Sequence, residues 1–192
     1  QITGKLLHKI TNVIRSSADD EPFFRKRETQ DMAFERSKRV WFITGSSAGF
    51  GRLLAEQVLA AGECVAATAR NPVGVADLEQ QFPDRALAIR LDVTDKQQVS
   101  AAVAQAISTF GHIDVLVNNA GYGLVAAQEE ATEDEIRRQI ETNVFGVIHV
   151  TRTVLPYMRK QRSGHIVNMS SVAGLAGTPG MGYYNLTKFA VE

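Results

Sequence analysis

The sequence of 192 residues has a single cysteine, no excess of either charge and no long apolar run. One cysteine cannot form an intramolecular disulfide or a cysteine-based metal cluster, so we predict a reducing, cytoplasmic location. The 21 Lys and Arg residues balance 21 Asp and Glu residues, which argues against a nucleic-acid partner because phosphates require a basic excess. No apolar run approaches the ~20 residues of a membrane-spanning helix, so stable membrane insertion is not expected. The 4 histidines show no ligand spacing, and no metal site is predicted.

The composition is otherwise that of a folded protein, with 44% hydrophobic and 22% charged residues. Residues 1–38 differ from the rest and are predicted to be an N-terminal extension or leader. Residues 1–17 contain no acidic residue, and apolar side chains recur there at helical spacing. This pattern fits a basic amphipathic helix that touches a membrane surface or targets the chain, and it also fits a leader that docks loosely or not at all. Residues 39–192 are predicted to form the folded domain.

From residue 39 onward, short apolar runs alternate with segments of helical periodicity. This alternation indicates βαβ units, and we predict an α/β fold with a doubly wound parallel sheet, the Rossmann fold. Thr132 and Glu135 have the spacing of a capping box at the start of a long helix, 132–159, which Pro156 should kink or end. The predicted strands are 40–43, 64–69, 86–91, 113–117 and 165–169, and the other predicted helices are 53–61, 75–81, 95–110 and 182–192.

A glycine-rich loop joins the first predicted strand to the first predicted helix. Gly45 can turn tightly off the strand, Gly49 lets the backbone approach a pyrophosphate, and Gly51 lets the helix pack close to the sheet. The helix N-terminus then offers free N–H groups and the positive end of its dipole to the phosphates. We therefore predict that a dinucleotide binds here. The predicted cofactor-binding residues of this loop are Gly45, Ser46, Ser47, Gly49, Phe50 and Gly51.

The second predicted strand ends without the acidic residue that would bind the ribose hydroxyls of NAD. Arg70 stands there instead, and its guanidinium suits a 2′-phosphate, so we predict NADP(H) as the preferred cofactor and keep NAD(H) as the alternative. Asp92, with Val93 beside it, ends the third strand on the same edge and is a candidate for binding the adenine amino group. Alternatively, Asp92 or Thr94 only caps the following helix.

Several further motifs follow the later strands and open the last helix. They are Asn-Asn-Ala-Gly at 118–121, Asn143, Asn-Met-Ser-Ser at 168–171 and Tyr-Asn-Leu-Thr-Lys at 184–188. With the glycine loop, these motifs resemble the short-chain dehydrogenase/reductase family, in its branch with a TGxxxGxG loop and a YxxxK pair. The resemblance covers residues 39–192. It implies that Asn119, Ala120 and Gly121 line the cofactor.

The spacing of Tyr184 and Lys188 places both side chains on one helix face. A nearby ammonium favours the charged form of a phenol, so Tyr184 can exchange a proton with a substrate oxygen near neutral pH. The resemblance implies that Ser171 orients the substrate carbonyl and that Lys188 also holds the nicotinamide ribose. It implies that Asn143 supports a water chain to the lysine, and a buried amide at a helix kink is the alternative.

The predicted function is the interconversion of a carbonyl and an alcohol on a small hydrophobic substrate. The alternative is a cofactor-binding or scaffold protein that keeps the fold and does not turn over. The resemblance also implies a homo-oligomer formed through the long helix and the Tyr184 helix. Family members continue with further strands beyond the position of Glu192. We therefore expect the 192-residue chain alone to bind the adenine half of NADP and to turn over poorly or not at all.

Overall fold

The computed structural model describes residues 38–192, which contain a parallel five-stranded sheet in the order β3-β2-β1-β4-β5. The chain starts at the central strand, adds β2 and β3 on one side, and then crosses to the other side for β4 and β5. This topology confirms the predicted doubly wound α/β fold. The predicted extension, residues 1–38, lies outside the described residues except for Lys38. The strands are β1 (Val40–Ile43), β2 (Cys64–Ala69), β3 (Ala86–Arg90), β4 (Val115–Asn118) and β5 (His165–Asn168).

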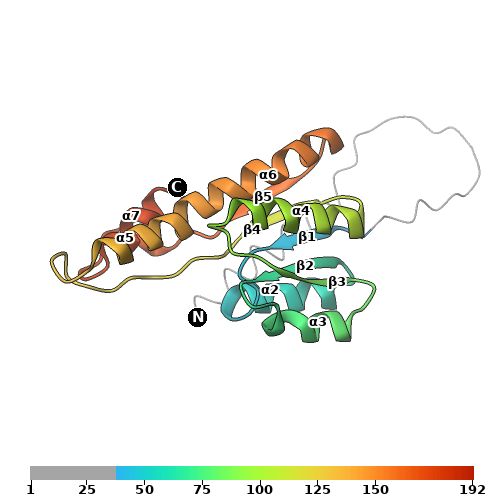
Figure 1. The fold of residues 1–192 in the computed structure, drawn as a ribbon, viewed down its shortest axis with the longest axis horizontal. Coiled ribbons are helices and arrows are strands. Elements are labelled where there is room, and N and C mark those ends of the chain that lie inside the picture. Colours follow the sequence, from blue (N-terminus) through green and yellow to red (C-terminus); the bar gives the residue numbers. More distant parts are fainter. Residues whose placement is uncertain (1–37) are drawn as a thin grey trace, which may run out of the picture. The chain divides into compact units, whose positions relative to one another are not determined.

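Helices cover both faces of the sheet, with α2 and α3 on one face and α4 and α6 on the other (Figure 1). None of the helices described for residues 38–192 combines the length and the apolar character of a transmembrane span. The α-helices are α2 (Gly49–Ala60), α3 (Ala76–Gln81), α4 (Lys96–Phe110), α5 (Glu133–Ile140), α6 (Gly146–Gln161) and α7 (Gly182–Phe189). Shorter turns are η1 (Pro72–Val75), the π-helical turn η2 (Glu141–Phe145) and η3 (Val172–Gly174).

The central strands are mostly apolar because both faces of the sheet are covered. Every residue of β1 and β2 is buried. Phe42 of β1 and Leu116 of β4 belong to one core cluster with Val103 of α4 and Val154 of α6, and all four are 0% exposed. Close packing on this face makes the sheet a rigid support for the loops that leave its carboxyl edge.

Two helix starts show how local chemistry sets the element boundaries. The capping box is confirmed, because Thr132 Oγ1 accepts from Glu135 N and the Glu135 carboxylate accepts from Thr132 N. Helix α4 is capped by Asp95, whose side chain accepts from the next turn's N–H groups. The alternative that Asp92 or Thr94 caps this helix is therefore wrong, since the residue directly before the first helical turn has the better geometry.

The predicted helix over 132–159 is continuous but irregular. A π-helical turn separates α5 from α6, and Pro156 does not end the helix, which runs on to Gln161. Proline removes the hydrogen bond to the carbonyl four residues earlier. That carbonyl belongs to Arg152, and both Arg152 and Pro156 are exposed, so water can replace the missing donor.

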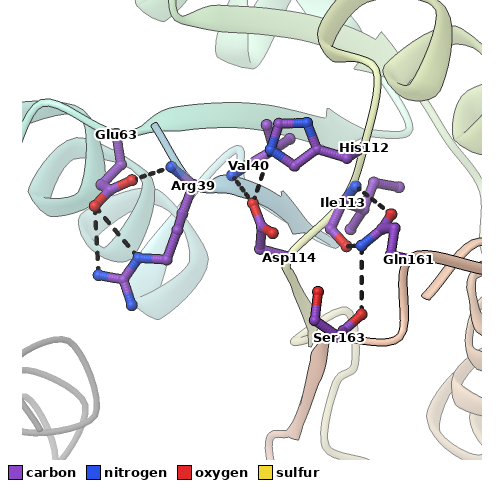
Figure 2. Close-up of polar contacts among 8 residues, drawn as sticks. All are labelled: Arg39, Val40, Glu63, His112, Ile113, Asp114, Gln161 and Ser163. Atoms are coloured by element: carbon purple, nitrogen blue, oxygen red, sulfur yellow. Dashed lines mark hydrogen bonds and ion pairs between the residues drawn. The ribbon is translucent and has the colours of Figure 1, made fainter. Parts of the chain in front are cut away.

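The amino edge of the sheet is closed by bonds between side chains and the main chain (Figure 2). The Asp114 carboxylate accepts from Val40 N at 2.7 Å, and its Oδ2 lies 3.1 Å from His112 Nε2. Glu63 accepts from the main chain and the guanidinium of Arg39. These contacts satisfy the polar groups at the start of β1. They lie at the edge opposite the loops that follow the carboxyl ends of the strands.

Candidate active site

All five strands are parallel, so their carboxyl ends meet at one edge of the sheet. The strand order reverses between β1 and β4, and ligands of doubly wound sheets bind at such a switch point. The predicted residues follow different strands and come to this one edge. They are the 45–51 loop after β1, Arg70 after β2, Asp92 and Val93 after β3, Asn119–Gly121 after β4, and Ser171 after β5.

The glycine loop needs glycine at three positions for two different reasons. Gly45 and Gly49 have φ angles of +69° and +58°, a backbone conformation that L side chains rarely adopt. Gly51 has an ordinary φ, but a Cβ there would overlap Gly45 O and Asn119 Nδ2. The expectation that Gly51 packs close to the sheet is thus refined: it packs against the loop and the turn after β4.

The N-terminus of α2 keeps its N–H groups available. Its N-cap residue, Ala48, supplies no side-chain oxygen, in contrast to the capped starts of α4 and α5. Ser47, Gly49 and Phe50 are exposed at this end. An uncapped helix start with an exposed, glycine-rich approach fits the phosphates of a dinucleotide, because these would accept from the free N–H groups.

Ser46 lies differently from its neighbours in the loop. Its side chain is buried, its Oγ donates to Ile43 O at 2.9 Å, and its N–H donates to Thr68 O at 2.8 Å. The structure therefore places Ser46 inside the turn, where it holds the loop to the ends of β1 and β2.

Thr44 is a site residue that sequence reasoning missed. Its Oγ1 accepts from Asn119 N at 2.9 Å and from Ala120 N at 3.0 Å. In return, Asn119 Nδ2 donates to Thr44 O at 2.9 Å and to Gly45 O at 3.0 Å. This buried clasp joins the loop after β1 to the turn after β4, and the Thr-Gly pair directly after the first strand was its only sequence signal.

The residues after β2 and β3 differ in the contacts that their side chains make. Arg70 is exposed, and no ion pair or side-chain hydrogen bond among the described residues involves it. Asp92 Oδ1 accepts from Thr94 N at 3.0 Å and from Thr94 Oγ1 at 2.7 Å. The Val93 side chain is buried against α6, where a Cβ on Gly146 would lie 2.6 Å from Val93 Cγ2.

Helix α7 carries the predicted proton-transfer pair. Lys188 Nζ lies 5.7 Å from the centroid of the Tyr184 ring and donates to Met169 O at 2.6 Å, just after β5. Lys188 is buried, and this burial lowers the pKa of its ammonium group. Ser171 is half-buried and caps η3, where its Oγ accepts from Ala173 N at 3.2 Å.

Asn143 lies in the π-helical turn and joins the loop after β4 to helix α7. Its Oδ1 accepts from Tyr122 N at 3.0 Å, and its Nδ2 donates to Tyr122 O at 2.8 Å and to Thr187 Oγ1 at 3.0 Å. A Cβ on Gly121 would lie 3.0 Å from Asn143 Oδ1, so glycine permits this approach. These contacts match the alternative of a buried amide at a helix irregularity, and the water-chain role stays a prediction.

Residues 38–192 contain no group of three His, Cys, Asp or Glu side chains arranged to hold a metal ion. At the carboxyl edge of the sheet these residues bring together the uncapped N–H groups at the start of α2, the exposed Arg70 guanidinium and Lys188 beside the Tyr184 ring, and Ser171 follows β5 at the same edge. Such a set suits the binding of an anionic dinucleotide and the movement of a proton at an adjacent substrate oxygen.

The sequence is similar to those of curated oxidoreductases and reductases. The chain is 46% identical over 154 residues to the oxidoreductase BOA17 of Botryotinia fuckeliana, covering 80% of this chain and 56% of that protein. It is 43% identical over 154 residues to the 3-ketodihydrosphingosine reductase of Bacteroides thetaiotaomicron, covering 80% of this chain and 55% of that protein. The chain thus spans about half the length of the curated relatives it matches.

Solved structures have the same fold. A short-chain dehydrogenase of Streptomyces avermitilis matches 81% of this chain and 57% of its own, with 46% identity and a TM-score of 0.78. A short-chain dehydrogenase/reductase of Burkholderia phymatum in complex with NAD matches 82% and 58%, with 34% identity and a TM-score of 0.77. A gluconate 5-dehydrogenase of Burkholderia cenocepacia in complex with NADP and tartrate matches 80% and 61%, with 33% identity and a TM-score of 0.75. Residues 39–192 also match the protein family described as short chain dehydrogenase, and the chain therefore belongs to that family.

Proposed function

We propose that the protein is an NADP(H)-dependent oxidoreductase that interconverts a carbonyl and an alcohol. The observation that carries this proposal is the placement of Lys188 beside the Tyr184 ring, anchored to the main chain after β5, at the sheet edge that also holds the glycine loop. Binding of the pyrophosphate at the start of α2 does not require a tyrosine beside a lysine, so the arrangement of this pair supports chemistry as well as cofactor binding.

The proposed proton transfer follows from the three side chains. A bound nicotinamide cofactor supplies or accepts the hydride at the substrate carbon. Tyr184 gives a proton to the carbonyl oxygen during reduction and removes it during oxidation. The Lys188 ammonium lies near the ring and favours its charged form, and the Ser171 hydroxyl orients the substrate oxygen by hydrogen bonding.

NADP(H) preference rests on Arg70, because the solved relatives include one complex with NAD and one with NADP. Arg70→Ala is expected to weaken NADPH binding about ten- to a hundredfold, since a hydrogen bond to a charged group contributes ~1.5–3 kcal/mol. NADH binding should change little, because NADH lacks the 2′-phosphate. Titrations of both cofactors followed by nicotinamide fluorescence give the two dissociation constants.

Arg152→Ala is the matched control for this titration, since Arg152 is an exposed arginine of α6. It should leave both dissociation constants unchanged. Equal losses of NADPH and NADH affinity in Arg70→Ala, or no loss of either, would remove Arg70 from the 2′-phosphate site.

The proposed substrate is a hydrophobic ketone, aldehyde or secondary alcohol. Val172 and Leu175, on the loop that follows Ser171, are 70% and 73% exposed, and Val125, on the loop before α5, is 72% exposed. Apolar side chains exposed beside polar reacting groups favour an apolar substrate body. The relative named 3-ketodihydrosphingosine reductase, 43% identical, supports a keto substrate.

Turnover separates this proposal from a scaffold protein that binds cofactor only. Nothing in the described residues favours the scaffold, and the position of Lys188 beside the Tyr184 ring supports turnover. The test is NADPH oxidation with a panel of apolar ketones and aldehydes, in a chain that includes any residues encoded after Glu192. Cofactor binding without turnover across the panel would favour the scaffold.

We also propose that the protein is a homo-oligomer and that it is located in the cytoplasm. Phe145 and Ile148 lie about one turn apart at the junction of η2 and α6 and are 43% and 39% exposed, which supports contact with a second copy through this helix. The Cys64 thiol is free and buried, in keeping with a reducing compartment. Sedimentation equilibrium of the wild type and of Ile148→Glu measures the oligomeric state. A wild type that sediments as a monomer, with the same mass as the variant, would contradict the oligomer.

A further inference from the structure

Asn185, on the catalytic helix beside Tyr184, directs its whole side chain to one neighbouring segment. It is 6% exposed, and its Nδ2 donates to Ala173 O at 2.8 Å and to Ala176 O at 2.9 Å. Its Oδ1 accepts from Thr178 N at 3.2 Å. All three partners lie in residues 173–178, which connect η3 to the approach of α7. A single buried amide thus closes this segment onto the helix.

The segment has little else to hold it in place. Its main-chain bonds are local: Gly174 N donates to Ser171 O at 2.9 Å, and Leu175 N and Ala176 N each donate to Val172 O at 3.0 Å. Ala173 is buried, but residues 175–178 are all exposed and Leu175 is 73% exposed, so apolar burial beyond Ala173 contributes little. A connection with few buried apolar contacts opens easily unless polar contacts hold it. The order of the exposed residues 175–178 therefore depends mainly on the Asn185 amide.

The segment is also seated tightly on the last turn of α7. A Cβ on Gly174 would lie 2.8 Å from Lys188 O and 2.8 Å from Ser170 Oγ, so only glycine permits this approach. Contacts at Asn185 and at Gly174 fix the segment at two points along the helix that carries Tyr184 and Lys188. Ser171 lies two residues before this segment, at the cap of η3, so its position relative to Tyr184 depends on the same two contacts.

We propose that Asn185 is a positioning residue for the proposed reaction. It holds residues 173–178 against α7. The Ser171 hydroxyl and the exposed Val172 and Leu175 then present a fixed wall to the substrate beside Tyr184. The inference rests on the proposed function and goes beyond it, because it assigns a role in substrate orientation to a residue that contacts neither cofactor nor substrate. Errors of about 1 Å in such an orientation reduce turnover strongly.

The test compares Asn185→Leu, which keeps a similar branched shape without hydrogen bonds, with Asn185→Ala and the control Leu186→Ala. Leu186 is the next residue of the same helix and is 55% exposed. In both Asn185 variants, amide hydrogen exchange of residues 174–178 should become at least tenfold faster, while α7 stays within about twofold. With octan-2-one as the probe substrate, kcat/KM should fall at least tenfold, while the Kd for NADPH stays within about twofold. Leu186→Ala should match the wild type in all three measurements.

Each contrary result overturns the inference in a distinct way. Unchanged exchange of residues 174–178 would show that Asn185 does not hold the segment. Equal loosening of α7, or weaker NADPH binding, would show a general structural role. Faster exchange with unchanged kcat/KM would show that the segment does not orient substrate. A wild type that reduces no ketone or aldehyde in the panel would instead contradict the proposed function, whereas the exchange pattern would still decide whether Asn185 holds the segment.

Discussion

Tyr184→Phe is expected to reduce turnover by about 10²- to 10⁴-fold, the usual contribution of a positioned acid or base, and to leave NADPH binding within about twofold. Phenylalanine keeps the ring that packs beside Lys188 and removes only the hydroxyl that carries the proton. Single-turnover measurements of NADPH oxidation, together with fluorescence titration of NADPH, separate the loss of chemistry from any loss of binding. The assay uses a chain that includes any residues encoded after Glu192.

Tyr183→Phe is the matched control, because it removes the same hydroxyl from the neighbouring residue. The Tyr183 hydroxyl donates to Gln128 O at 2.9 Å, so this variant should lose about 1 kcal/mol of stability and little activity. The two tyrosines are adjacent in sequence, but only Tyr184 has a lysine on its own helix face. Similar rates for the two variants would show that Tyr184 is not the proton donor.

Gly51→Ala is expected to weaken binding of NADPH and NADH at least a hundredfold, about 2.7 kcal/mol. The added Cβ would overlap Gly45 O and Asn119 Nδ2, and both are rigid parts of the clasp around Thr44. The loop must therefore move away from the turn after β4, and overpacking of this kind also costs about 1–3 kcal/mol of stability. Isothermal titration and urea unfolding give the two quantities.

Gly62→Ala is the control for a glycine replaced in the same helix-and-loop unit. Gly62 follows the other end of α2 with a φ of +89°, and a Cβ there would meet nothing within 4 Å. This variant should lose about 1–2 kcal/mol of stability through its left-handed backbone, while NADPH binding remains unchanged. If both variants lose stability and neither loses affinity, the glycine loop is not the dinucleotide site.

Much of the fold was predictable because the signals for its elements are local. The apolar runs at 40–43 and 64–69 are strands with the predicted bounds. A parallel strand that is buried on both faces reads as a continuous apolar run, so it can be recognised without knowing which strands pair with it. Gly111 ends α4 in a left-handed conformation, as a glycine after a helical pattern predicts. Where the expectation was less accurate, the surroundings of the residue in the folded protein decided the end of the element. Pro156 stays inside α6 at an exposed position, where water can replace the donor that proline lacks.

The sequence alone determined the order and chemistry of the site motifs, because spacing along one helix or directly after one strand places side chains without reference to the rest of the chain. The Tyr184 and Lys188 pair and the positive-φ glycines are of this kind. Only the tertiary structure decided what the buried amides and hydroxyls do. Thr44 contacts a turn 75 positions away, Asn143 reaches α7 across 44 positions, and Asn185 closes a separate loop. Such polar groups bond to whatever partner the packed core brings within about 3 Å, and no periodicity in the sequence encodes that partner.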